Sequence, residues 1–229
     1  MKYLNIHTHK ISKNENTISL LNVFPNNIPE IDKKQYYSIG IHPWYVSENT
    51  KKEHLGIVEK FLQKENFIAC GEIGLDKNYP NFNLQKEIFI EQLKLAQNAD
   101  KPVIIHNVKS SSEILSIIKK NKVSVPKIIH RYGGNITTAR QFAQSGFYLS
   151  FGHALFNDKS KTKKVFTKLP LNNIFLETDD SEKSIEEIYK KAFSLRDEDS
   201  RKVKISLLQN YIDMRTYTIT NQYNRKNDK

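Results

Sequence analysis

Seven polar residues of this chain could take part in metal or acid–base chemistry, and each lies at or near the end of an apolar stretch. They are His7, His9, His42, Glu72, His106, His130 and Asp179. His7 and His9 are two residues apart, so in a strand both imidazoles face the same side. Imidazole is a common metal ligand near neutral pH, and carboxylates often complete such sites. Four of the imidazoles and the two carboxylates supply enough ligands for two ions that share a bridging group.

Glu72 has an unusual setting, because Gly71 and Gly74 lie close to it within the apolar run F-I-A-C-G-E-I-G-L-D. A carboxylate among glycines in such a strand is not typical of a surface residue. Small neighbours would let two ions approach the same carboxylate, so we interpret Glu72 as a bridging ligand. Two ions lower the pKa of a bound water and neutralise an oxyanion, which favours hydrolysis.

These residues need a scaffold that brings strand ends together. Short apolar runs predict strands at residues 3–7, 17–24, 36–41, 66–75, 102–106, 126–130, 147–151 and 173–179. Helical spacing of apolar residues predicts helices at 51–64, 84–98, 110–118, 136–144, 159–169, 185–195 and 201–214. This alternation predicts an α/β fold, a TIM (β/α)8-like barrel, in which the C-terminal ends of the strands converge on one active face.

No internal repeat, Gly/Ser linker or change of composition divides the chain. We therefore expect a single barrel domain over residues 1–214. Residues 215–229 are polar and show no apolar period, so we expect this C-terminal tail to be frayed and disordered.

Composition is that of a globular protein, with 38% hydrophobic and 27% charged residues in a chain of 229. No apolar run approaches the roughly 20 residues that span a membrane. The single cysteine, Cys70, excludes an intramolecular disulfide, and with no secretory signal pattern we expect a cytoplasmic protein without an obligate protein partner. The net charge of +11 suits a polyanion, but it comes mainly from lysines in an Asn- and Ile-rich sequence and favours nucleic acid only slightly.

Six motifs together resemble the TatD family of metal-dependent hydrolases and deoxyribonucleases, within the amidohydrolase-like barrels. They are H-T-H at His7–His9, G-I-H-P at Gly40–Pro43, G-E-I-G-L-D at Gly71–Asp76, P-V-I-I-H at Pro102–His106, I-I-H at Ile128–His130 and L-E-T-D at Leu176–Asp179. G-E-I-G-L-D followed by L-E-T-D is highly specific for this family.

The resemblance implies a role for each polar residue. It implies that His7, His9 and Asp179 hold one metal ion. It also implies that His106 and His130 hold a second ion, that Glu72 bridges the two, and that His42 lies beside the scissile phosphate. Mixed nitrogen and oxygen ligands suit Zn²⁺, Mn²⁺ and, less well, Mg²⁺.

Three departures from the family pattern put the choice of substrate in doubt. Asn5 stands where the family usually has aspartate, and its neutral amide should orient a ligand histidine less strongly. Many members carry arginine two residues after the histidine of the fifth strand, whereas this chain has Val108 and then Lys109. The family's proline-containing segment after L-E-T-D is also missing, so the chain resembles a shortened branch.

The leading hypothesis is a metal-dependent hydrolase that cleaves DNA phosphodiester bonds. Asp179 would accept the proton of the attacking water, while His42 and Lys109 would help to hold the phosphate. One alternative is an amide or lactone hydrolase of small molecules on the same scaffold. Another is a nucleic-acid-binding protein with weak catalysis, although the intact ligand set argues against it.

Overall fold

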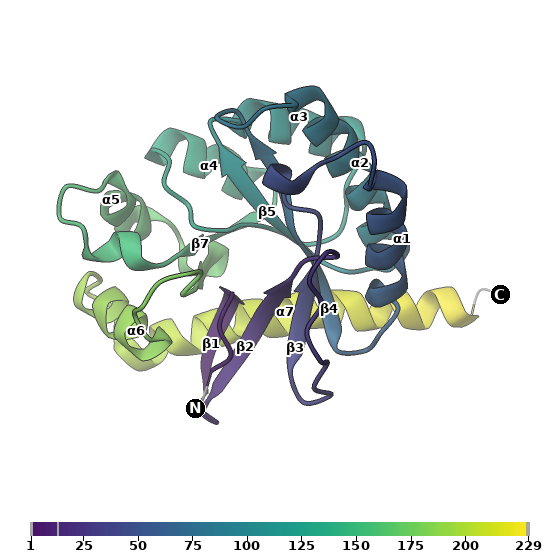
Figure 1. Ribbon diagram of the computed structural model, residues 1–229. Coiled ribbons are helices and arrows are strands. Elements are labelled where there is room, and N and C mark those ends of the chain that lie inside the picture. Colours follow the sequence, from purple (N-terminus) through teal and green to yellow (C-terminus); the bar gives the residue numbers. More distant parts are fainter. Residues whose placement is uncertain (1, 13, 228–229) are drawn as a thin grey trace. The chain divides into compact units, whose positions relative to one another are not determined.

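A computed structural model describes residues 2–12 and 14–227 of the chain, apart from the side chains of residues 225 and 226 (Figure 1). It divides into two compact units. Unit 1 comprises Met1–Leu21 and Ile129–Asp213, and unit 2 comprises Asn22–Ile128 and Met214–Lys229. A single domain over residues 1–214 stays a prediction.

Unit 2 contains three parallel strands with helices between them. Its strands are β3 (Tyr36–Ile39), β4 (Phe67–Asp76) and β5 (Val103–Val108), and its helices include η1 (Pro43–Tyr45), α1 (Lys51–Leu62), α2 (Phe82–Asn98) and α3 (Ser111–Lys120). All ten residues of β4 are buried. A strand buried on both faces is typical of parallel sheets covered by helices, and it explains the near-continuous apolar run.

Unit 1 contains the first strand and the last two strands of the chain. They are β1 (Tyr3–Thr8), β7 (Phe147–Phe151) and β8 (Ile174–Leu176), accompanied by α4 (Ile136–Gln144), η2 (His153–Phe156), α5 (Lys161–Lys168), η3 (Leu171–Asn173) and α6 (Ile185–Ser194). The segment after β8 lies parallel to β1, because Thr8 and Asp179 form a bridge. This bridge joins the first strand to the segment that follows the last strand.

The remaining strands, β2 (Thr17–Val23) and β6 (Lys127–Ile129), each contribute residues to both units. Neighbouring strands pair in chain order, and β1 pairs with β2 in parallel from Tyr3 and Thr17 onwards. The predicted strand and helix positions therefore agree closely with the observed elements up to residue 214.

The last helix, α7 (Ser200–Asn227), is longer than predicted, because residues 215–227 continue it. In unit 1, Asn210 donates hydrogen bonds to the backbone oxygens of Leu171 and Ile174. In unit 2, Thr218 is buried and Gln222 donates to the backbone oxygen of Ala99. Contacts of this kind order a polar segment that has no apolar period of its own. The expectation of a frayed tail is thus corrected for residues 215–227, and residues 228–229 lie outside the described residues.

Within the described part of the chain, no helix combines the length and the apolar character needed to cross a membrane.

Candidate active site

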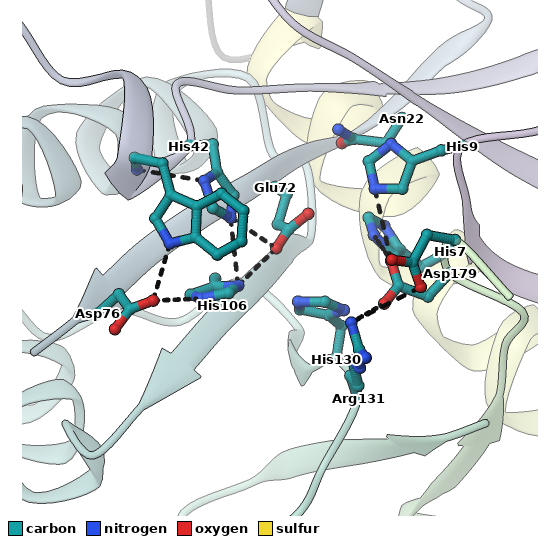
Figure 2. Close-up of polar contacts among 12 residues, drawn as sticks. His7, His9, Asn22, His42, Glu72, Asp76, His106, His130, Arg131 and Asp179 are labelled. Carbon is teal, nitrogen blue, oxygen red and sulfur yellow. Dashed lines mark hydrogen bonds and ion pairs between the residues drawn. The ribbon is translucent and has the colours of Figure 1, made fainter. Parts of the chain in front are cut away.

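In unit 1, His7, His9 and Asp179 form a cluster at the ends of β1 and β8 (Figure 2). The Nε2 atoms of His7 and His9 lie 3.6 and 3.5 Å from Asp179 Oδ1. One potential ligand atom from each residue lies within 4.8 Å of the other two. Two imidazoles and a carboxylate at this spacing fit the coordination of a divalent metal ion.

The backbone holds this cluster in place. Asp179 donates its N–H to the backbone oxygen of His7, and His9 donates its N–H to the backbone oxygen of Asp179. Asp179 also has a φ of 55°, in the left-handed region that non-glycine residues seldom adopt. The strand pairing thus presents both histidines to the one carboxylate.

Asn5 contacts the chain next to Asp179 through both ends of its amide. Its Nδ2 donates to Thr178 Oγ1 at 2.8 Å, and its Oδ1 accepts from the Thr178 N–H at 3.0 Å. An amide offers both a donor and an acceptor, whereas an ionised aspartate only accepts. Asn5 therefore fixes the segment that carries Asp179, a role that sequence comparison with the family did not suggest.

His130, the predicted ligand on the sixth strand, also lies in unit 1. Its ring centroid is 4.6 Å from that of His7, and its Nδ1 is 3.6 Å from Glu177 Oε1. Glu177 is fully buried and also accepts the Arg131 N–H at 2.5 Å. Glu177 belongs to the L-E-T-D motif, so the motif itself was the signal that could have identified it.

Arg131 is a further residue that the sequence analysis missed. Its Nη1 donates to Asp179 Oδ2 at 2.9 Å, on the carboxylate whose other oxygen faces His7 and His9 (Figure 2). Burial opposes ionisation of Asp179, but the facing imidazoles of His7 and His9 and the nearby His130 together outweigh it and hold the pKa of this carboxyl well below its usual range. Asp179 is therefore ionised at neutral pH.

Unit 2 holds a second cluster, formed by His42, Glu72 and His106 (Figure 2). Glu72 Oε1 lies 3.0 Å from His42 Nε2 and 2.7 Å from His106 Nδ1, and the two ring nitrogens are 3.2 Å apart. His42 is thus grouped with two predicted metal ligands. The geometry therefore also allows His42 to be a metal ligand, and its contact with a phosphate stays a prediction.

The glycines near Glu72 serve the packing of β4 on β5. A Cβ atom at Gly71 would lie 2.6 Å from Ile104 Cβ, and one at Gly74 would lie 2.1 Å from the backbone oxygen of His106. Gly74 also has a φ of 141°. These glycines allow β5 to approach closely, which gives them a role in packing, and Glu72 as a bridging ligand stays a prediction.

Asp76, at the end of β4, supports His106 and is another residue not predicted as part of the site. Its Oδ2 accepts a 2.8 Å hydrogen bond from Trp44 Nε1 and lies 3.4 Å from His106 Nε2. Burial raises the pKa of Asp76, but hydrogen bonds from Trp44, the Asn78 backbone and His106 together lower it below its ordinary value. A carboxylate on the outer nitrogen of a ligand histidine fixes the orientation and tautomer of the ring.

Aromatic side chains lie beside this second cluster. Trp44 makes an edge contact with His42 at 4.8 Å and stacks on Tyr79 at 4.6 Å with an interplanar angle of 13°. Trp44 is 44% exposed and Tyr79 is 40% exposed. An exposed stack next to a polar cluster offers a surface for a planar group.

Lys109, predicted to hold phosphate, is exposed directly after β5 with a φ of 52°. Within the described residues its side chain forms no hydrogen bond or ion pair. The structure therefore does not bring Lys109 into the cluster of unit 2.

Comparison with known proteins identifies the family of this chain. A family model described as "TatD related DNase" matches residues 7–212. The chain belongs to the TatD-related DNase family. This TatD-family chain is 33% identical over 148 residues to the uncharacterized metal-dependent hydrolase YabD of Bacillus subtilis, an alignment that covers 63% of the chain and 58% of YabD. The match thus spans less than two thirds of that relative.

Two solved structures resemble the TatD-family chain in fold. The crystal structure of YjjV, a TatD homologue from Escherichia coli, aligns with a TM-score of 0.72 at 27% identity, over 81% of this chain and 78% of YjjV. A TatD family hydrolase from Entamoeba histolytica aligns with a TM-score of 0.72 at 15% identity, over 93% and 97% of the two chains. The predicted fold class, an α/β barrel of the TIM type, is therefore confirmed.

Proposed function

We propose that this TatD-family protein is a metal-dependent hydrolase that cleaves phosphodiester bonds in DNA. The observation that supports it most is the cluster of His7, His9 and Asp179, in which two imidazoles meet an ionised carboxylate. The second cluster in unit 2 has the same donor types. Because the chain belongs to this family, we assign these imidazole and carboxylate groups to hydrolysis.

Each cluster has residues suited to hold a divalent ion. His7, His9 and Asp179 would hold one ion, and Glu72 with His106 would contribute to a second. A bound divalent ion supplies Lewis acidity, which lowers the pKa of a water and offsets phosphate charge. Bridging by Glu72 and the pairing of His106 with His130 stay predictions, as does the identity of the metal.

The chain's own residues supply the remaining steps. Asp179, which is ionised, would take the proton of the attacking water. Arg131 holds the other oxygen of this carboxylate at 2.9 Å, which keeps it oriented. In unit 2, His42 is the group proposed to contact the scissile phosphate.

DNA as the substrate is supported by the net charge of +11, by the family description and by the exposed Trp44–Tyr79 stack. Stacking of a base on an aromatic side chain contributes about 1–3 kcal/mol and does not depend on sequence. The stack lies beside His42. The terminal base of a DNA strand held at His42 would therefore lie close to Trp44.

The test is incubation of the purified protein with labelled single- and double-stranded DNA in the presence of Mg²⁺, Mn²⁺, Zn²⁺ or EDTA. We expect metal-dependent cleavage that Glu72→Gln largely removes and that Glu59→Gln, a matched change at an exposed glutamate, leaves intact. DNA retention without cleavage would instead indicate a binding protein. Indifference to DNA would indicate a hydrolase of small molecules.

A further inference from the structure

Unit 2 contains a cavity of about 570 Å³ remote from the His42 cluster. Its lining residues come from the C-terminal end of α1, the loop from α2 to β5 and the second half of α7. Its wall residues Glu65 and Lys101 precede β4 and β5, whereas Asp76 and His106 lie towards the other ends of these strands. The cavity is thus at the opposite end of the strands from the proposed chemistry.

Two basic side chains line this cavity, and neither forms an ion pair with another described residue. Lys101 is only 5% exposed, and its amine forms no hydrogen bond or ion pair within the described residues. Arg215 stacks its guanidinium over the Tyr36 ring at 5.7 Å, but its buried Nη1 has no hydrogen-bond partner there. Buried charges in proteins are normally paired, because an uncompensated charge is costly to remove from water.

The neighbouring acidic groups compensate these two cations only in part. Glu65 is exposed, so solvent screens its attraction. Asp100 also lines the cavity, is buried and has a partner of its own. The carbonyl ends of α1 and α2 offset part of the positive charge. Even so, burial and the nearby Arg215 lower the pKa of Lys101 to about 8.

We propose that Lys101 and Arg215 form a binding site for a phosphate group. This inference goes beyond the proposed hydrolysis and does not depend on it. A tetrahedral oxyanion can accept hydrogen bonds from the amine and from the guanidinium Nη1 at the same time, and its charge removes the repulsion between the two cations. Gln222 lines the same cavity, with its Nε2 already bonded to the backbone oxygen of Ala99.

The size of the cavity indicates what kind of molecule the phosphate group belongs to. Cavities of roughly 300–1,000 Å³ hold small organic ligands, and inorganic phosphate alone would fill only part of this one. Leu62 and Ile219 add apolar wall next to the basic groups. The geometry therefore favours a phosphate monoester of a small organic molecule over the free ion.

The experiment measures binding of two probes, orthophosphate and thymidine 5′-monophosphate, to the full-length protein by calorimetry. We expect saturable binding of the monoester that is tighter than that of orthophosphate. Lys101→Gln and Arg215→Gln should each weaken it by about tenfold or more, since each removes a charge-assisted hydrogen bond. Lys101→Arg should retain most of the affinity, and Lys60→Gln, at an exposed position of α1, should bind as the wild type does.

Chemical modification of Lys101 distinguishes binding in this cavity from binding at the histidine clusters. Either phosphate probe should protect Lys101, but not Lys60, from acetylation in peptide mass spectra, because a bound phosphate would cover the amine that lines the cavity. Circular dichroism verifies that each variant is folded, and Arg215→Gln tests the site should Lys101→Gln fail to fold. The proposal would be overturned if Lys101→Gln and Arg215→Gln both bound the probes as the wild type does, or if Lys60→Gln lost as much affinity as they do. Absence of protection of Lys101 at millimolar probe would overturn it as well.

Discussion

The indole Nε1 of Trp44 donates a hydrogen bond of 2.8 Å to Asp76 Oδ2, and the same oxygen lies 3.4 Å from His106 Nε2. One carboxylate oxygen therefore connects an exposed aromatic residue to a candidate metal ligand. Asp76 thus contacts both Trp44, which is proposed to stack on a base, and His106, which is proposed to hold a metal ion.

Asp76→Asn should lower activity without unfolding the protein. The amide loses the charge that orients His106, and such supporting contacts typically contribute about 10–100-fold in metal affinity or activity. Metal content by atomic emission and turnover measured together provide the test, with Asp213→Asn at an exposed position of α7 as the control. Equal turnover of the Asp76 variant and the control would show that His106 needs no such support.

Glu72→Gln should remove most hydrolysis while the fold largely survives. A neutral amide keeps the shape of the side chain but cannot hold cations with a full negative charge, and Glu72 contacts both His42 and His106. Turnover is compared with the number of metal ions bound per chain. Near-normal turnover with fewer than two ions bound would refute the bridging role.

Asp179→Asn should lower turnover more than DNA affinity. Its carboxylate is assigned to a metal ion and to the proton of the attacking water, and loss of a general base typically costs about 10² to 10⁴ in rate. DNA affinity and single-turnover cleavage are measured at fixed salt, because phosphate contacts depend on salt. Collapse of affinity with a normal rate in the bound complex would assign Asp179 to substrate positioning instead.

Asn5→Asp should destabilise the protein by about 1–3 kcal/mol, because a buried carboxylate cannot donate to Thr178 Oγ1. Urea unfolding of wild type and variant measures the difference. Repeating both measurements in a Thr178→Val background isolates the contact, and we expect the difference to shrink there. An undiminished difference would mean that the amide acts through another neighbour.

Lys101→Gln should gain stability relative to the wild type at neutral pH and lose this advantage in alkali. The pKa of Lys101 in the folded protein, about 8, lies below its ordinary value of 10.5. The folded state therefore binds this proton less tightly than the unfolded state does. The resulting destabilisation is fully present below pH 8 and fades as the pH rises towards 10.5. Between pH 7 and 9.5 the gap should narrow by up to about 2 kcal/mol, measured by urea unfolding without phosphate. A pH-independent gap would contradict the shift.

The sequence by itself determined the order and type of the elements and the positions of the polar residues along them. Apolar runs and helical spacing are local properties, so β4 and α2 could be predicted from their own residues. Strand ends such as those at His7 and His106 could likewise be predicted, because parallel α/β folds place functional residues there. The family followed from short motifs such as G-E-I-G-L-D.

Only the tertiary structure decided which side chains meet. Arg131 reaches Asp179, and Trp44 reaches Asp76, across separations that no periodicity encodes. The ordering of residues 215–227 also depends on contacts with distant segments, as when Gln222 bonds to Ala99. Hydrogen bonds and burial act through space between segments remote in the chain. The partners of a polar residue are therefore set by packing, whereas its place at a strand end is set by the local sequence.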